Sequence, residues 1–201
     1  VGGVTDADTE FNDNLYFYDN LGYNASGGMY DQNTGYAANT FKKKNDVEIL
    51  KEVIIGSPTY TDYEAYLIPN KVESILLEDA TKLASGTITY GGYKTIKLEE
   101  EIILSDEEFT IIVKYTNTEG FAIPLSIKDN SLYYTVNIED NRGFVSMDGI
   151  NFNDSKTYFT DTIAIPSIKA STNNKIEDTV EPDDPNDPEN TDPDNPNDPE
   201  N

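Results

Sequence analysis

The 201-residue chain contains no cysteine, no histidine and no tryptophan. Without thiol and imidazole groups it cannot form disulfides, a zinc site with the usual nitrogen and sulfur ligands, or a Ser/His or Cys/His catalytic pair. Serine catalysis with a lysine base would need a Ser-x-x-Lys motif on a helix, and none stands out. Most familiar hydrolytic machinery is therefore unavailable to this chain.

Basic residues are also scarce, with 14 Lys and Arg against 38 Asp and Glu and a net charge of −24 at pH 7. A nucleic-acid backbone or an anionic membrane surface must be met by clustered basic residues, and only residues 42–44 (KKK) run together. No apolar run approaches the roughly 18 residues of a membrane-spanning helix. The composition therefore argues against nucleic-acid binding and against membrane insertion.

Short runs of β-branched and aromatic residues that alternate with polar ones fill most of the chain, which predicts strands. The predicted strands are residues 15–19, 35–41, 48–56, 62–68, 86–90, 93–98, 108–116, 123–127, 132–138, 143–147 and 162–170. Gly91-Gly92 is expected to join 86–90 and 93–98 as a hairpin or a bulged strand. Only residues 71–83 have helical apolar spacing, which predicts one or two helical turns.

About ten short strands with at most one short helix predict an all-β jelly-roll β-sandwich. Pro166 in the last strand indicates an edge or a bulge. The alternation predicts a core of apolar side chains. These are Phe17, Ala38, Phe41, Val53, Ile55, Tyr63, Ala65, Leu67, Ile96, Leu98, Phe109, Ile111, Val113, Val145, Ile163 and Ile165.

Three regions differ in composition. Residues 1–14 are polar and lack periodicity, so they are expected to be a linker from an upstream region. A start at Val1 without Met indicates a processed product or, as we expect, a piece of a longer protein. Residues 15–172 form the predicted domain. Residues 173–201 are expected to be a disordered, stiffened acidic Asp/Asn-Pro spacer, with eleven acidic and no basic residues from Glu177 onward.

The Gly-rich loop at 27–35 holds the densest set of possible ion ligands in the predicted domain. Asp31, Asn33 and nearby backbone carbonyls are oxygen ligands, which suit Ca²⁺. The alternative is that Asp and Asn are here because they favour turns. Acidic runs at 99–101 and 106–108 could supply the two carboxylates of a glycosidase, but a solvated loop explains them better.

Five tyrosines crowd into the opening stretch: Tyr16, Tyr18, Tyr23, Tyr30 and Tyr36. Exposed aromatic faces ringed by Asn and Asp are typical of a carbohydrate-binding surface, and Tyr30 and Tyr36 are the predicted ligand contacts. The alternative is that tyrosine replaces Trp and Phe in the core, half buried with its hydroxyl in water.

Several segments, in order, resemble one known family. They are FYDNLGY (17–23), TGYAANTF (34–41), SPTYTDYEAYL (57–67), ASGTITYGGYKTIKL (84–98), EEFTIIVKYT (107–116), AIPLSI (122–127) and FVSMDGINFNDSK (144–156). Over residues 15–172 the chain resembles the lectin-like domain that follows papain-type cysteine peptidase domains in secreted and cell-wall proteins of clostridia and some archaea. The resemblance implies a two-sheet jelly roll similar to carbohydrate-binding modules, a non-catalytic role and, from at least one clostridial surface protease, a bound Ca²⁺.

The expected function is therefore that of an accessory domain of an exported cysteine peptidase. It would position the upstream peptidase domain of the same protein and bind carbohydrate or a cell-wall polymer. Its expected location is extracellular, at the cell wall or cell surface of a bacterium or archaeon. The alternative is a structural or adhesin-type β module that binds a host or envelope protein.

Overall fold

The computed structural model describes residues 12–20, 22–28, 32–70, 72–117, 120, 123–128, 138–159 and 162–175. These residues form thirteen strands, one short α-helix and one 3-10 turn. The prediction of an all-β sandwich with at most one short helix is confirmed. Within the described residues no helix is long and apolar enough to cross a membrane.

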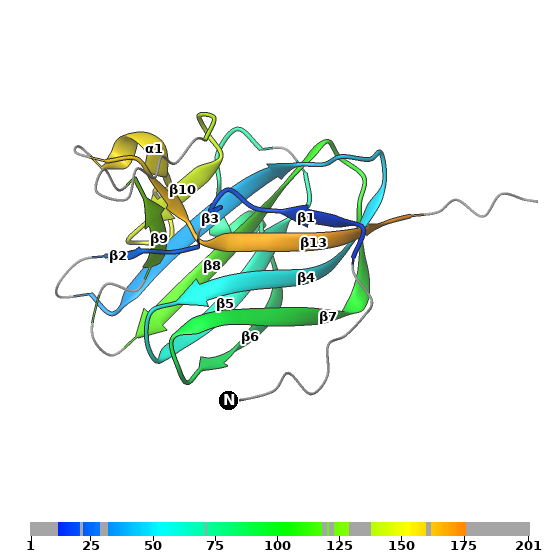
Figure 1. Cartoon of the computed structure of the whole chain (residues 1–201). Coiled ribbons are helices and arrows are strands. Elements are labelled where there is room, and N and C mark those ends of the chain that lie inside the picture. The colour runs from blue at the N-terminus through cyan, green and yellow to red at the C-terminus, as the bar shows by residue number, and fades with distance from the viewer. Residues whose placement is uncertain are drawn as a thin grey trace, which may run out of the picture.

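Two large antiparallel sheets pack against each other, and Figure 1 shows the four-stranded sheet in front of the six-stranded one. The four-stranded sheet has the order β1 (Asn14–Tyr16), β13 (Ile168–Asn174), β4 (Glu48–Ser57), β7 (Gly92–Leu104). The six-stranded sheet has the order β11 (Asn153–Asp154), β10 (Gly143–Ser146), β3 (Thr34–Lys42), β8 (Glu108–Asn117), β5 (Thr61–Ile68), β6 (Thr81–Ile88).

A small third sheet lies at one end of the sandwich, to the left in Figure 1. Its order is β12 (Ala164–Pro166), β9 (Ile123–Ile127), β2 (Ala25–Gly27), and the helix α1 (Ser155–Tyr158) packs beside β12 and β10. The predicted strand at 162–170 is divided at Ser167 between β12 and β13. Pro166 therefore ends an edge strand, as its missing N–H requires.

The main core fills the space between the two large sheets. The rings of Tyr16, Phe41 and Phe109 meet there, with the Phe41–Phe109 and Tyr16–Phe109 centroids both 5.5 Å apart. Burying each such side chain contributes about 1.5–3 kcal/mol. Most of the predicted core residues are buried, and Leu98 and Ile163 are half-buried. The prediction for Phe17 was wrong, because its side chain is 40% exposed.

A second, smaller core lies on the outer side of the six-stranded sheet. Ala38 and Ile112 point away from the main core, and Ile75 covers them. The apolar residues at 72–80 thus cover a sheet instead of forming a helical stripe. Of the one or two helical turns predicted for residues 71–83, the structure has a single 3-10 turn, η1 (Leu77–Asp79), and residues 81–83 already belong to β6.

The predicted hairpin around Gly91-Gly92 was wrong. β6 pairs with β5 and β7 pairs with β4, so the chain crosses from one sheet to the other at this turn. Both strands alternate as a hairpin would, because alternation reports the buried face and not the pairing partner. Residues 132–137 of the predicted strand at 132–138 and the acidic segment beyond residue 175 lie outside the described residues, and Ile138 is not in a strand.

Candidate functional site

The structure describes two of the four residues predicted to contact a ligand or ion. Tyr30 and Asp31 lie outside the described residues. The side chain of Asn33 is exposed, and its backbone carbonyl accepts a hydrogen bond from the amide of Asn117 at 2.9 Å. Among the described residues no group of three or more acidic side chains could hold a metal ion. The calcium site therefore stays a prediction.

Tyr36 lies on the outer side of β3, against the turn that contains Gly149. A Cβ atom at Gly149 would be 2.9 Å from the Tyr36 ring. Across the sheet Tyr36 pairs with Lys114, which pairs in turn with Glu64. Three hydrogen bonds, from Lys114, Lys82 and Tyr66, lower the pKa of Glu64 to about 2. Glu64, Lys82 and Lys114 on this face thus form ion pairs with one another.

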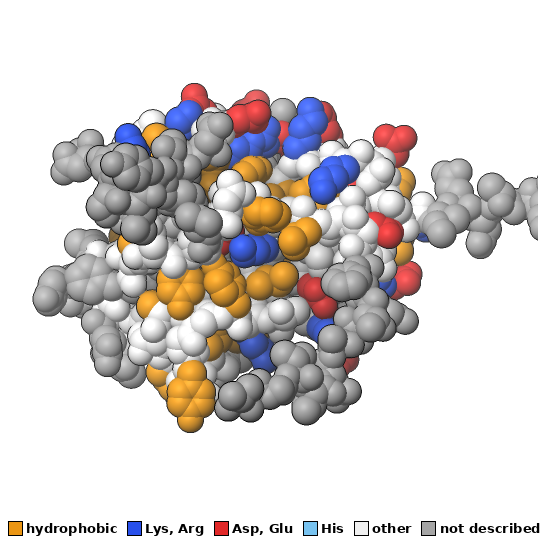
Figure 2. Space-filling view, in the orientation of Figure 1, with side chains coloured by type: hydrophobic (Ala, Val, Ile, Leu, Met, Phe, Trp, Pro, Cys, Tyr) orange, Lys and Arg blue, Asp and Glu red, His pale blue; other side chains and the backbone are white. Residues whose placement is uncertain are grey.

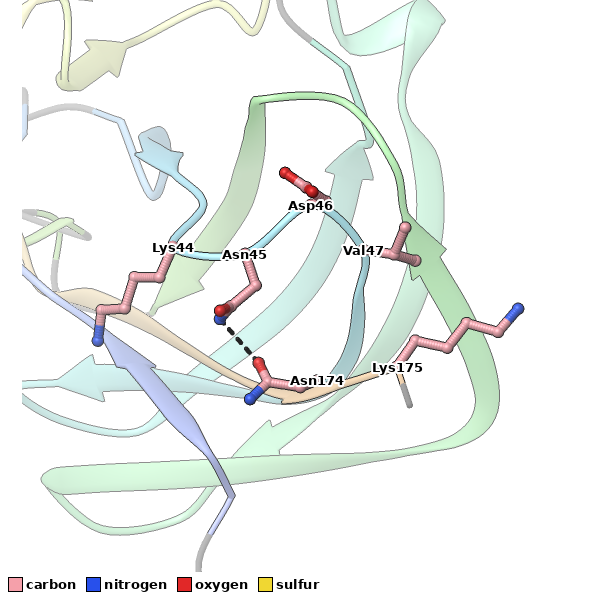
Figure 3. Close-up of a pocket in the computed structure, with 6 residues that line it drawn as sticks. All are labelled: Lys44, Asn45, Asp46, Val47, Asn174 and Lys175. Carbon is pink, nitrogen blue, oxygen red and sulfur yellow. Dashed lines mark hydrogen bonds between the residues drawn. The ribbon is translucent and has the colours of Figure 1, made fainter. Parts of the chain in front are cut away.

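A depression of about 670 Å³ lies where β13 ends, lined by residues 44–47, Asn174 and Lys175. Figure 3 shows its side chains. The side-chain amide of Asn45 donates to the side-chain oxygen of Asn174 at 2.7 Å, and the side chains of Lys44 and Lys175 extend in different directions. Since the polar groups either bond to each other or diverge, this depression has no convergent set of ligand contacts.

The outer face of the four-stranded sheet presents aromatic side chains to solvent. Figure 2 shows hydrophobic side chains gathered over this sheet around a lysine. Phe17 is 40% exposed and Tyr93 is 46% exposed. The Lys169 ammonium lies 5.1 Å from the centre of each of these two rings, within the range of a cation–π contact. We call Phe17, Tyr23, Tyr93 and Lys169 the aromatic platform.

The opening stretch of the chain contributes Phe17 and Tyr23 to the platform. The other two members come from β7 and β13, which are far away in the sequence. After β1 ends, the amide of Gly22 donates to the carbonyl of Asp19 at 3.1 Å, which makes a turn. The turn brings Tyr23 against Tyr93, with ring centroids 5.6 Å apart. Gly22 has φ 81°, and a Cβ atom there would be 2.7 Å from the Tyr93 hydroxyl, so this position requires glycine.

Tyr23 lies on the outer face because of Gly56 in β4. Val53 and Ile55 point into the core, so the alternation of β4 turns Gly56 outward. A Cβ atom at Gly56 would be 2.7 Å from the Tyr23 ring. The Tyr23 hydroxyl donates to the backbone carbonyl of Ser57 at 2.8 Å. Tyr23 is therefore packed flat on β4.

A buried carboxylate, Asp19, holds the platform from below. Its side chain is fully buried and accepts hydrogen bonds from the hydroxyls of Ser167 and Tyr93, the latter at 3.0 Å. It also forms an ion pair with Lys169 at 3.2 Å. Burial of the phenol, together with the charge of Asp19, raises the pKa of Tyr93 to about 12, so the phenol stays protonated at neutral pH.

This arrangement suits a ligand that has both apolar faces and hydroxyl groups. The rings of Phe17 and Tyr93 are partly open to solvent beside Lys169, while a hydrogen bond fixes the hydroxyl of each platform tyrosine. An ammonium group has three donors, and Lys169 forms an ion pair with Asp19 Oδ1 without a hydrogen bond to it, which leaves donors for a ligand. A sugar ring has the matching chemistry, with C–H groups that stack on aromatic rings and hydroxyls that accept hydrogen bonds.

Sequence reasoning found only part of this site. Tyr23 belonged to the tyrosine cluster read as a carbohydrate surface, but Phe17 was assigned to the core. Tyr93 and Lys169 were not considered, because they come from β7 and β13. The available signal was the run Tyr16-Phe17-Tyr18. Because Tyr16 and Tyr18 pack on the core, alternation places Phe17 on the opposite face.

Comparisons with known proteins agree with the fold. The family model of the lectin-like domain matches residues 15–172. The chain is similar to the crystal structure of the cysteine protease and lectin-like domains of Cwp84, a surface layer associated protein of Clostridium difficile. The identity is 26% and the TM-score 0.62, and the match covers 71% of this chain and 33% of that one.

A second structure, of the clostridial cysteine protease Cwp84 after propeptide cleavage, has 24% identity and a TM-score of 0.70. That match covers 81% of this chain and 40% of that one, so the chain spans two fifths or less of the length of either. No curated protein matches the chain. Because the family model extends over most of the chain, this protein belongs to the lectin-like domain family.

Proposed function

We propose that the protein is a non-catalytic accessory domain of an exported cysteine peptidase, and that it binds carbohydrate or a cell-wall polymer at the aromatic platform. Family membership supports the first part, because Cwp84 combines a cysteine protease domain with a lectin-like domain and is surface layer associated. In this proposal the domain acts outside the cell, at the cell wall or surface, and positions the peptidase domain on its substrate.

The observation that carries the proposal is that the platform presents two exposed rings, Phe17 and Tyr93, of which Tyr93 is held by a buried carboxylate. An exposed aromatic side chain loses the stabilisation that burial would give, about 1.5–3 kcal/mol for a ring of this size. Here Tyr93 is fixed by its hydrogen bond to a fully buried carboxylate, so little of its side-chain freedom remains to be lost when a ligand stacks on it. Rings that are held in place in this way favour binding.

Alanine substitution at Phe17 tests this proposal. Stacking contacts contribute about 0.5–1.5 kcal/mol each, so Phe17→Ala should weaken binding to purified cell-wall polysaccharide by about threefold to tenfold. Because Phe17 lies outside the core, the melting temperature should stay unchanged. The matched control is Tyr158→Ala, since Tyr158 is 46% exposed but lies on α1.

A further variant, Tyr36→Ala, tests the surface predicted from the sequence, which is the outer face of the six-stranded sheet. Loss of binding in Tyr36→Ala with full binding in Phe17→Ala would place the ligand on the six-stranded sheet and contradict the platform. A chain that binds no glycan but retains a protein from the cell envelope would favour the adhesin-type alternative.

A further inference from the structure

We infer that the ligand of the platform is an internal stretch of an extended glycan chain, contacted over several consecutive sugars, and not a single sugar or a chain end. This inference rests on the proposed function and concerns the same surface. It follows from exposed aromatic side chains beyond the platform and from the open shape of the surface at both ends.

The first observation is at the end of the sheet where β7 begins. Tyr90 is 83% exposed and precedes β7 by two residues, and Tyr60 is 45% exposed in the turn between β4 and β5. These two turns touch each other, because a Cβ atom at Gly91 would be 2.7 Å from the carbonyl oxygen of Pro58. Tyr60 and Tyr90 therefore sit at the same end of the sandwich.

Pairing in the four-stranded sheet connects this end to the platform. Gly92 pairs with Ser57, and Tyr93 pairs with Gly56, on which Tyr23 packs. Tyr90 is only three residues from Tyr93. At the rise of an extended strand, about 3.3 Å per residue, the Cα atoms of the two residues are within about 10 Å of each other. In Figure 2 hydrophobic side chains gather over β13 and another lies at the lower edge of the molecule, near the turn that precedes β7, with white surface between them.

The aromatic row, defined as Phe17, Tyr93 and Tyr90 with Tyr60 at its end, offers more exposed rings than one sugar can stack on. Phe17 and Tyr93 each lie 5.1 Å from Lys169, so their ring centres are at most twice that distance apart. Tyr90 extends the row further. Because one aromatic face stacks on one sugar ring at a time, full use of the row requires several sugars in a chain.

The second observation is at the opposite end of the row. Phe17 also lines a depression of about 470 Å³, whose other wall includes Tyr18, Lys42 and Arg142. The row therefore continues into an open hollow instead of ending at a wall. At the other end Tyr90 is 83% exposed, so this end of the row is open to solvent among the described residues, unlike a site built for a chain terminus. A chain can pass along the surface in both directions.

A length series tests this inference. The purified cell-wall polysaccharide that the domain binds is partially hydrolysed, and its fragments are separated by size. The affinity of the full chain for each fragment is measured by calorimetry. We expect affinity to rise by about tenfold or more from the shortest fragments to those that span the row, because aromatic contacts accumulate.

Tyr90→Ala is the decisive variant, with Tyr158→Ala as the control. We expect Tyr90→Ala to weaken binding of long fragments by about threefold to tenfold and to leave short fragments unaffected, whereas Phe17→Ala weakens both. Equal affinity for all lengths, or an equal effect of Tyr90→Ala on short and long fragments, would overturn the inference while the proposed function stands. Absence of binding to every fragment and to the intact polymer would overturn both.

Discussion

Two buried carboxylates fix the side chains around the first strand. Asp19 holds the platform, and Glu48 holds the junction between β1, β4 and β13. Glu48 is fully buried and accepts hydrogen bonds from the Tyr16 hydroxyl at 2.7 Å, from the backbone amide of Asn45 at 3.0 Å and from the Thr172 hydroxyl. Neither role was visible in the sequence, because Tyr16 and Thr172 are 32 and 124 residues from Glu48.

Substitution of Glu48 tests its structural role. Burial alone would raise the pKa of Glu48, but the hydrogen bonds from Thr172, Tyr16 and Asn45 outweigh burial and lower it. A glutamine has one acceptor oxygen and directs its NH₂ at donors, so Glu48→Gln should destabilise the domain at pH 7 by about 1–3 kcal/mol. The melting temperature should then fall by about 2–4 °C for each kcal/mol.

The pH dependence of this effect has a defined sign. Because the pKa of Glu48 is lower in the folded than in the unfolded protein, its contribution is complete above the unfolded value of about 4.3 and is lost as pH falls through the folded value. The difference in melting temperature between wild type and Glu48→Gln should therefore shrink in acid. A difference that stays constant down to pH 2 would contradict this account of Glu48.

At the scale of elements, several strands were predicted closely, but β2 and β11 were missed and strand partners were not predicted. The solvated loop predicted at 99–101 was wrong, because β7 runs on to Leu104 through these residues. The predicted bounds of β9 match those of the structure, and those of β3, β4, β5 and β8 agree within one residue at either end. Alternation identifies such strands because it depends only on which face is buried. Pairing depends on contacts between distant segments, which is why the predicted hairpin of β6 and β7 was wrong.

The candidate site was predictable to a similar extent. The opening stretch was correctly singled out as an aromatic segment, and Tyr23 lies in the platform. The remaining members come from β7, β13 and the residue after β1, and only the fold brings these segments together. Phe17 was misassigned because three consecutive aromatic residues fit either phase of the alternation. Burial of Tyr16 in the core decides that phase.

At the scale of the whole molecule, the two ends of the domain meet. β1 pairs with β13, with Asn14 opposite Thr172, so the preceding and following segments leave from the same end of the sandwich. Without residues 177–201 the chain still has 27 acidic and 14 basic residues. Outside its few basic positions, an acidic surface of this kind favours cations and neutral polymers over anionic ones.

We propose that Ca²⁺ stabilises the folded domain through Asp31 and Asn33. A ligand that binds only the folded state at one hundred times its Kd stabilises by about 2.7 kcal/mol, so adding a chelator should lower the melting temperature by several degrees. Asp31→Asn should remove the difference between melts with and without Ca²⁺. A melt that the chelator leaves unchanged would contradict calcium binding.

The central claim is that the aromatic platform is the carbohydrate-binding surface of this lectin-like domain. The most direct test is to titrate the isotopically labelled chain with cell-wall oligosaccharides and to follow backbone and aromatic NMR shifts. The account predicts that the shifts concentrate at Phe17, Tyr23, Tyr93 and Lys169 and extend to Tyr90 with longer fragments. Shifts confined to Tyr36 and the outer face of the six-stranded sheet would contradict it.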